Sequence, residues 1–272
     1  MKIIFILISL LFANVVSALA QNKEYDKEFN RLNNAPAKLA FYDDFSTLWT
    51  KNWHLDGKVA RVIQQNNEIK VYAGEKVYNE DKSLADENHL VLWTKKEFEG
   101  DIKIEYDFTR LDSSKYYWVN ILYIQAQGCG EGVYKKDIFK WNKLRDIPGM
   151  HEYFNHMDAY HISYAVQPVP EEGKREYIRA RRYMPVWKKG LKGTNLKNEY
   201  YDSNLFKTNH TYHITCIKKG KEIYFNVKGD NRNETFYFNG SEFPAIEKGR
   251  IGLRQMFTRH SKYDNFKVYL LK

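Results

Sequence analysis

Histidine and tyrosine side chains gather in one stretch of the sequence, residues 149–183. His151, His156 and His161 are three of the eight histidines in the chain, and Tyr164 follows the last of them. Histidine and tyrosine can pass protons to and from a reacting group. We therefore take His161, Tyr164 and His151 as candidate catalytic residues. Core histidines with no chemical role are the alternative.

Arginines follow in the same stretch. Arg179 and Arg181 are two residues apart, and in a β-strand such residues point to the same face. Two guanidinium groups on one face can hold one anion through several N–H donors. Arg181 is therefore a candidate catalytic residue, and Arg179, Arg182 and Tyr183 are candidates for substrate binding. The alternative is a solvated basic edge.

Amide side chains that suit hydroxyl groups lie in the segment 117–127. Period-two alternation places Gln125 and Gln127 on one face of this predicted strand. A buried amide without a partner is costly, so we interpret the two glutamines as a polar floor for a sugar. Asn120 is a further substrate-binding candidate. Glutamines that face solvent or pair at a sheet edge are the alternative.

Several established catalytic motifs do not occur in the sequence. His151 and His156 are five residues apart rather than four, which places them about 140° apart around a helix and unable to grip one zinc ion. There is no glycine-rich phosphate loop, no nucleophile elbow and no Cys/His metal-ligand spacing. The segment 105–110 ends in arginine where a β-sandwich glucanase carries an acid. These observations argue against a metalloprotease and a glucanase, and we predict no catalytic metal.

The elements that must position these side chains are mostly β-strands. Aromatic residues make up 16% of the chain, a bias typical of pleated, half-buried surfaces. Helical spacing occurs at 137–146, followed by a helical turn at 151–157, and Lys219–Lys221 is a hairpin signal. We predict strands at 39–45, 60–65, 68–73, 89–94, 101–111, 117–127, 159–166, 177–183, 211–218, 222–228, 234–239, 250–255 and 263–271. This pattern favours an all-β jelly-roll sandwich of two antiparallel sheets with a short helical insertion.

The first 20 residues have the parts of an export signal. Lys2 precedes an apolar run, and Ala18–Ala20 gives a small-x-small cleavage site before Gln21. The run is too short for a membrane span. We predict a signal peptide at 1–20, a linker at 21–36 and a jelly-roll catalytic domain at 37–272 of a periplasmic or secreted protein. An uncleaved anchor helix is the alternative.

Charge and cysteine content bear on partners and compartment. The formal net charge of +9 suits an anionic partner, although it also serves to solvate the surface. We expect no nucleic-acid partner, and the sequence does not fix an oligomeric state. Cys129 and Cys216 are compatible either with one disulfide in an oxidising compartment or with two free thiols.

Several segments together resemble the YesU-like group of concanavalin A-like sandwiches, which occurs with bacterial polysaccharide-degradation systems. They include NILYIQAQG at 120–128 and YIRARRYMP at 177–185, and the others are 41–45, 89–93, 161–165, 249–254 and 263–266. The resemblance implies an oligosaccharide dehydratase of ulvan breakdown. Such an enzyme removes water from a uronic acid at the non-reducing end and leaves a 4,5-unsaturated sugar.

This elimination makes definite chemical demands. The hydrogen on C5 becomes acidic only when the neighbouring carboxylate charge is neutralised, a role we assign to Arg179 and Arg181. A base must take the hydrogen and an acid must protonate the departing oxygen, roles we assign to His161 and Tyr164. An ideal strand places those two side chains on opposite faces, so a bulge must turn one, or His151 takes one role. No cofactor is required, and a structural calcium ion is possible.

Two other functions are open to a chain of this kind. A non-catalytic carbohydrate-binding module would stack sugars on Tyr123, Tyr183 and Trp187 and would not need the histidines. A polysaccharide lyase would use the same elimination chemistry to cut internal uronic acid linkages.

Overall fold

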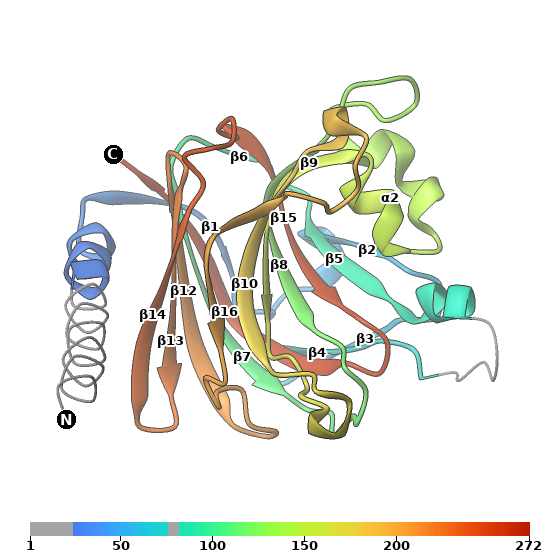
Figure 1. The fold of residues 1–272 in the computed structure, drawn as a ribbon, viewed down its shortest axis with the longest axis horizontal. Coiled ribbons are helices and arrows are strands. Elements are labelled where there is room, and N and C mark those ends of the chain that lie inside the picture. The colour runs from blue at the N-terminus through green and yellow to red at the C-terminus, as the bar shows by residue number, and fades with distance from the viewer. Residues whose placement is uncertain (1–23, 76–81) are drawn as a thin grey trace, which may run out of the picture.

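Two antiparallel β-sheets lie face to face in the computed structural model, which describes residues 24–75 and 82–272 (Figure 1). The all-β sandwich expected from the strand pattern is confirmed. The predicted export signal at 1–20 lies outside the described residues. No helix within 24–75 or 82–272 has the length and apolar character needed to cross a membrane.

We call the first layer sheet A. Its longest strand is β16 (His260–Leu271), which pairs with β7, β4 and β1. In spatial order the sheet runs β3 (Arg61–Gln65), β4 (Glu68–Tyr72), β16, β7 (Ile102–Arg110), β12 (Thr211–Lys219), β13 (Glu222–Gly229) and β14 (Arg232–Asn239), with β1 (Ala37–Asp43) on β16.

Sheet B is the second layer and carries most of the candidate residues. In spatial order it runs β2 (Trp53–Asp56), β5 (Leu90–Thr94), β15 (Lys248–Gln255), β8 (Asn120–Gly128), β9 (Met157–Tyr164), β10 (Tyr177–Tyr183) and β11 (Asn195–Tyr201), with β6 (Phe98–Glu99) on β15. β11 also meets β14 through the pair Lys197 and Asn239, so it joins the two sheets.

Short helices connect the strands. Residues 24–33 are helical, and α2 (Met150–Phe154) follows the 3₁₀ segment η3 (Ile138–Arg145). The remaining 3₁₀ turns are η1 (Trp49–Lys51), η2 (Lys82–Asn88), η4 (Pro170–Glu172) and η5 (Pro185–Trp187).

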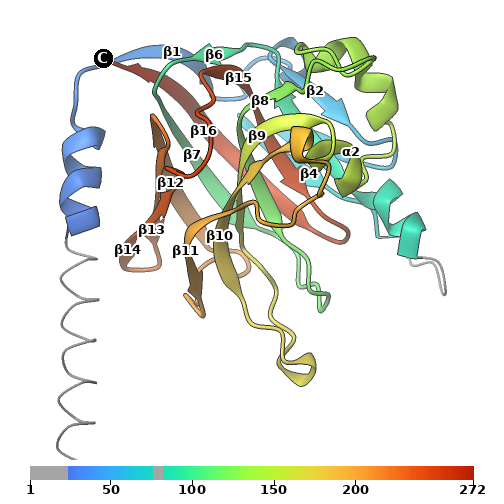
Figure 2. The same cartoon turned by 45° about the horizontal axis from the view of Figure 1, so that its top comes forward.

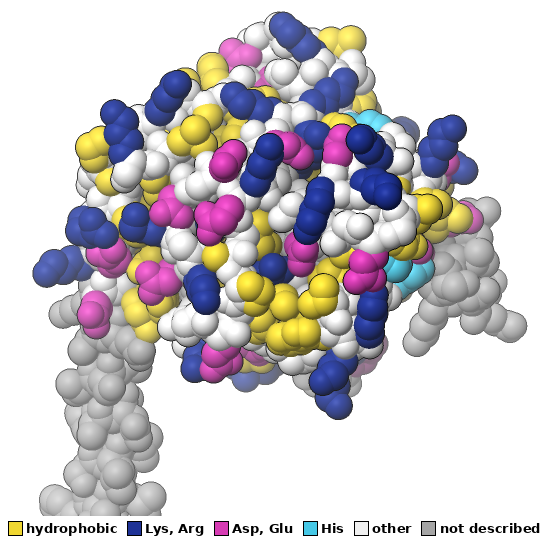
Figure 3. All heavy atoms as spheres, turned by 90° about the horizontal axis from the view of Figure 1, so that it is seen from above, with side chains coloured by type: hydrophobic (Ala, Val, Ile, Leu, Met, Phe, Trp, Pro, Cys, Tyr) yellow, Lys and Arg dark blue, Asp and Glu magenta, His cyan; other side chains and the backbone are white. Residues whose placement is uncertain are grey.

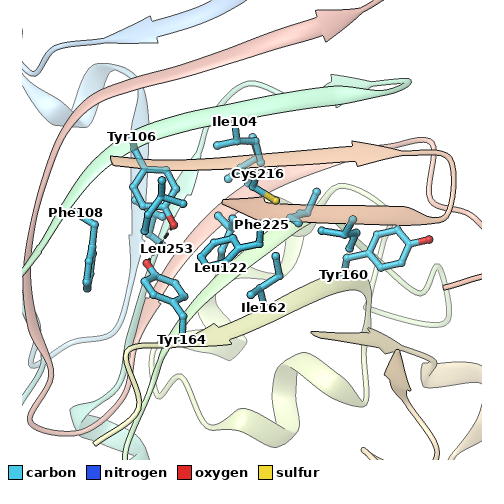
Figure 4. Close-up of a cluster of buried hydrophobic side chains, with 14 of the residues drawn as sticks. Ile104, Tyr106, Phe108, Leu122, Tyr160, Ile162, Tyr164, Cys216, Phe225 and Leu253 are labelled. Atoms are coloured by element: carbon cyan, nitrogen blue, oxygen red, sulfur yellow. Dashed lines mark hydrogen bonds between the residues drawn. The ribbon is translucent and has the colours of Figure 1, made fainter. Parts of the chain in front are cut away.

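The main core fills the space between the sheets. Along β7, Ile104, Tyr106 and Phe108 point inward, as period-two alternation predicts. Figure 4 shows these side chains facing Leu122 of β8 and others from sheet B. The predicted hairpin is confirmed, because Lys219 pairs with Glu222 across a turn.

Both cysteines are free thiols. Cys216 of β12 lies in the core between the sheets, and burial raises the pKa of its thiol. Cys129 is half-buried just beyond the end of β8. The disulfide alternative is therefore wrong, and the free-thiol alternative holds.

A second apolar cluster lies on the outer face of sheet B, beneath η3 and α2. Asp56 of β2 anchors this helical insertion: its carboxylate accepts hydrogen bonds from Arg145 Nε at 2.6 Å, Trp93 Nε1 at 2.7 Å and the Tyr153 hydroxyl at 3.0 Å. The Trp93 ring stacks on Tyr123 at 5.3 Å between centroids. Gly252 permits this, since a Cβ there would lie 2.5 Å from the indole.

The helix at 24–33 packs on the outer face of sheet A, beside β13 and β14 (Figure 2). Phe29 and Leu32 share one side of the helix and cover Tyr224 and Tyr237. The predicted linker at 21–36 is helical over residues 24–33, because two apolar side chains spaced for a helix pack against an apolar surface.

Candidate functional site

Two rows of side chains cross the outer face of sheet B. Residues paired across antiparallel strands point to the same side of a sheet. The first row is Arg254, Ile121, Ser163 and Arg179, on β15, β8, β9 and β10. The second row is Gly252, Tyr123, His161 and Arg181 on the same strands. Residues from the predicted strands at 117–127, 159–166 and 177–183 are therefore brought together on one face.

His161 lies at the centre of these rows and is 3% exposed. Its Nδ1 is 2.6 Å from the Tyr183 hydroxyl, and its Nε2 is 2.5 Å from Ser163 Oγ. Burial holds the pKa of His161 well below its usual value, and the positive charges of Arg181, Arg254 and Arg179 act in the same direction. The imidazole is consequently neutral near pH 7, with one nitrogen able to accept a proton.

Arg179 and Arg181 leave the core face, while Ile178 and Ala180 enter it, as alternation predicts. Their surroundings differ. Arg179 Nε lies 2.9 Å from Glu199 Oε1, so its charge is balanced. Arg181 Nη1 donates to Thr194 Oγ1 at 3.2 Å and to the Leu191 carbonyl at 3.3 Å.

No carboxylate of the described chain forms an ion pair with Arg181. Burial lowers the pKa of this guanidinium, and the like charge of Arg179 lowers it further. Arg181 thus carries a positive charge that has no ion-pair partner among the described residues, and it lies beside a neutral histidine. An arrangement of this kind suits an anionic ligand.

Arg254 is a third arginine on this face and is fully buried. Its Nη2 donates to His89 Nδ1 at 3.0 Å and to the Pro148 carbonyl at 2.5 Å, and its guanidinium lies 4.6 Å from the centre of the Tyr153 ring. Arg254 has no ion pair with a carboxylate in the regions 24–75 and 82–272.

His151 lies on α2 and is exposed. Its Nδ1 is 3.8 Å from Asp86 Oδ2, and Asp86 Oδ1 is 3.5 Å from His89 Nδ1. Burial raises the pKa of Asp86, although Arg254 and His151 oppose the shift. His151 is therefore connected to Arg254 through Asp86 and His89, and not directly to His161.

The expected role of Tyr164 needs correction. Its side chain lies in the core between the sheets, where the Tyr106 hydroxyl donates to its hydroxyl at 3.2 Å (Figure 4). Residues 161–164 of β9 pair in unbroken register with residues 120–123 of β8, so no bulge turns Tyr164 toward His161. Tyr183 takes the place next to His161 instead.

The amide candidates also lie apart from the two rows. A bulge in β8 gives Gln125 a φ of 50° and buries its side chain, which donates to the carbonyls of Phe98 at 3.2 Å and Gly100 at 2.9 Å. Gln125 therefore ties the strand edge together and is not part of a sugar floor. Gln127 is half-buried opposite Asp158.

Two other substrate-binding candidates face inward. The amide nitrogen of Asn120 donates to Ser261 Oγ at 3.0 Å, and its amide oxygen accepts from Arg259 Nε at 3.2 Å. Arg182 points to the opposite side from Arg181 and pairs with Asp158 at 3.4 Å. Both side chains are buried in internal networks, so their assignment to substrate binding is corrected.

Sequence reasoning did not identify Arg254, His89 and Ser163 as site residues. Arg254 could have been found, because it alternates with the apolar Ile251 and Leu253 on a predicted strand. Its position opposite β8 could not, since nothing local in the sequence gives the strand order.

Neither of two surface hollows in the described part of the chain is lined by His161, Arg181 or Arg254. One, of about 610 Å³, is lined by Arg175, Asp202, Arg232 and Glu234 among others. Arg175 pairs with Asp202 and Arg232 with Glu234, so these arginines already have acidic partners. The other hollow, of about 650 Å³, lies beside the helix at 24–33.

Surface charge and metal ligands complete the description. Figure 3 shows lysine and arginine side chains interspersed with acidic ones on the face that it views, so positive charge is not gathered there into one patch. Among the residues that the structure describes, no three histidine, cysteine or carboxylate side chains are grouped to hold a metal ion.

Comparison with known proteins gives a family and a fold. The sequence pattern of a domain of unknown function, DUF1961, matches residues 45–268. The uncharacterized protein YesU of Bacillus subtilis is 23% identical over 189 residues, which are 68% of this chain and 79% of YesU.

Two solved structures show the same architecture. A Bacillus subtilis protein of unknown function with a galectin-like fold has a TM-score of 0.63 at 19% identity, covering 86% of this chain and 98% of that one. The exoplasmic/lumenal domain of VIP36 bound to Ca²⁺ and Man3GlcNAc has a TM-score of 0.55 at 11% identity, covering 86% and 91%. These similarities establish a lectin-like jelly roll.

Proposed function

This chain belongs to the DUF1961 family, and we propose that it is an exported carbon–oxygen lyase that removes water from a terminal uronic acid of ulvan-type acidic oligosaccharides. One observation carries the proposal. A neutral His161, bonded to Tyr183, lies beside Arg181, which has no acidic partner in the described chain. A base, an acid and an unpaired cation are the three groups that elimination next to a carboxylate requires.

Each residue has a defined part in the reaction. Arg181 pairs with the uronate carboxylate and stabilises the charge that develops there as the C5–H bond breaks. The proton passes to His161. The C4–O bond breaks as the electron pair forms the C4–C5 double bond, and the oxygen leaves as water with a proton from Tyr183. Burial raises the pKa of Tyr183 well above its usual value, so the hydroxyl is protonated and able to donate.

The fold supports a glycan as the ligand. The VIP36 domain, which has the same architecture, is bound to a mannose-containing glycan in its structure. Since one fold serves binding proteins and enzymes alike, the choice of a lyase rests on the residues around His161 and not on the fold.

Incubation with ulvan oligosaccharides tests the proposal. We expect ultraviolet absorbance from a conjugated double bond and a mass loss of one water. His161→Gln and Tyr183→Phe should each lower turnover by about a hundredfold or more, the usual effect of removing a proton-transfer group. Tyr164→Phe is the matched control, because this core hydroxyl touches no substrate, and it should retain turnover.

The same assay separates the two other functions. Tight oligosaccharide binding without product, unchanged in His161→Gln, would identify a binding module. Shortened chains in place of dehydrated ones would identify a polysaccharide lyase that cuts internal linkages.

We also propose that residues 1–20 direct export and that 37–272 form the catalytic domain. Mass spectrometry of protein from the culture medium or periplasm should find Gln21 at the amino terminus. Retention of residues 1–20 in that fraction would contradict a cleaved signal.

A further inference from the structure

Two buried donors on the outer face of sheet B have no partner within the described residues. They are Nη1 of Arg254 and Nε2 of His89, on side chains that are 0% and 1% exposed. A buried polar atom without a partner costs free energy, and such atoms are rare in folded proteins. Both belong to one hydrogen-bonded pair, since Arg254 Nη2 contacts His89 Nδ1 at 3.0 Å.

The contact with Arg254 fixes the proton on His89. A guanidinium nitrogen can only donate, so Nδ1 of His89 must accept. Burial and the charge of Arg254 hold the pKa of His89 well below its usual value, which keeps the ring neutral. A neutral imidazole carries one proton, and here that proton is on Nε2. The unpartnered atoms are therefore two N–H donors that have no acceptor in the described part of the chain.

The acids nearby do not use these donors. Asp86 is 3.5 Å from His89, but from Nδ1 and not from Nε2. Asp56, a buried acid beneath the insertion, is bonded to Arg145, Trp93 and Tyr153.

The pair lies on the other side of His161 from Arg181. Arg254 is on β15, two strands from His161, while Arg181 is on the adjacent strand β10. With strands about 4.8 Å apart, the backbones of Arg254 and Arg181 are separated by roughly three strand spacings, and their long side chains lie on the same face on either side of His161.

We propose that Arg254 and His89 form a second oxyanion subsite, in which Arg254 Nη1–H and His89 Nε2–H donate to a carboxylate or sulfate group on the sugar next to the reacting uronate. This inference rests on the proposed function. It adds that the preferred substrate carries an acidic group on each side of His161. A small oxyanion should also occupy the subsite by itself.

Inorganic sulfate is the first probe, with acetate as the carboxylate probe and sodium chloride at equal ionic strength as the control. Binding to the folded protein raises the melting temperature as the anion concentration increases. Arg254→Lys should weaken sulfate binding by about tenfold or more, the effect of losing a hydrogen bond to a charged group. Arg175→Lys, at a surface arginine paired with Asp202, should bind sulfate as the wild type does.

Two variants of His89 test whether its Nε2–H donates to the oxyanion or whether the ring only positions Arg254. Asparagine places its polar atoms near the position of Nδ1, so His89→Asn keeps the contact with Arg254 and loses the Nε2 donor. Glutamine reaches the position of Nε2, so His89→Gln keeps the donor and loses the contact. The proposal expects weaker sulfate binding in His89→Asn than in His89→Gln.

Failure of the subsite is distinguishable from failure of the lyase. The subsite would be overturned, even if product forms, by either of two results. One is that sulfate and acetate raise the melting temperature no more than chloride. The other is that Arg254→Lys keeps wild-type sulfate binding and an unchanged KM for the ulvan oligosaccharides that are dehydrated. Sulfate binding that depends on Arg254 in a protein that yields no unsaturated product would support the subsite and overturn the lyase. A reversed order of the two His89 variants would mean that His89 only positions Arg254, which also overturns the proposal.

Discussion

Arg179 and Arg181 are neighbours on one strand face, and within residues 24–75 and 82–272 only Arg179 has an acidic partner. The Glu199 carboxylate balances the charge of Arg179, whereas Arg181 contacts a hydroxyl and a carbonyl. Sequence periodicity could predict that both side chains share a face. It could not predict which of them is free to bind a ligand, because Glu199 comes from a strand that periodicity did not reveal.

Arg181→Lys should lower turnover on acidic oligosaccharides by about a hundredfold, because lysine lacks the planar pair of donors that stabilises developing charge. The melting temperature should change little. Arg179→Lys is the matched control on the same strand, and we expect it to retain most activity. Steady-state turnover and thermal melts of both variants provide the test, and equal losses in the two would contradict the distinction drawn here.

His161 and His89 predict a loss of stability in mild acid. Both have a folded-state pKa well below the unfolded value of about 6.5, so below that pH the unfolded chain binds protons that the folded chain does not. The free energy of unfolding should therefore fall between about pH 6.5 and pH 5, by up to about 1.4 kcal/mol per pH unit for each histidine. Urea unfolding across this range should show a shallower slope for His161→Gln. An equal slope in wild type and variant would show that His161 is not responsible.

Alternation predicts the face of a side chain correctly where strands pair without interruption, and incorrectly where a bulge shifts the register. Alternation placed His161 and Arg181 on the outer face, since their strands pair without interruption. It failed at Gln125, where a bulge in β8 turns the side chain inward. Alternation also placed Tyr164 on the face opposite His161, so its predicted role as the acid depended on an assumed bulge. Bulges arise from pairing between distant segments, so a local pattern does not reveal them.

At the scale of elements, the sequence pattern predicted the helical insertion but not the strand β11. Helical spacing at 137–146 predicted η3 closely. β11 was missed because its sequence, NLKNEYY, is largely polar and buries only Leu196. β2 is four residues long and β6 is two, too short for alternation to be evident.

Of the substitutions around the helical insertion, those of Asp56 should lower the free energy of unfolding most. Asp56→Asn leaves the buried guanidinium of Arg145 without its counter-charge, and we expect a loss of about 3 kcal/mol or more in the free energy of unfolding. Asp146→Asn is the control, because Asp146 pairs with Lys58 at the surface and should contribute less than about 1 kcal/mol. Denaturant unfolding of both variants measures the difference. A cost for Asp56→Asn as small as that of the control would show that the insertion does not depend on this anchor.

At the scale of the whole molecule, the two cysteines lie in different environments. Cys216 is enclosed between the sheets and Cys129 is half-buried outside that core. The sequence could not decide between a disulfide and free thiols, because that choice depends on where the two strand ends meet in space.

A thiol reagent should therefore react with different numbers of cysteines in the folded and the unfolded protein. We expect one reactive thiol, Cys129, in the native state and two after denaturation without a reductant. Cys129→Ser should abolish the native reaction and leave one thiol in the denatured protein. Detection of no thiol in the denatured wild type would mean that a disulfide forms.

The position of β16 has a consequence for how the chain is made. This strand, the latest in the sequence of those that the structure describes, lies between β7 and β4 and also pairs with β1, so that Leu271 faces Ala37. Pairing between segments so far apart slows folding, because a long loop must close first. During synthesis from the amino terminus, the ribosome produces residues 260–271 long after β1, β4 and β7. Until then these three strands lack β16, the strand with which each of them pairs. The nascent chain consequently remains without a complete sheet A, and open to chaperones or a translocation channel, for nearly the whole period of its translation.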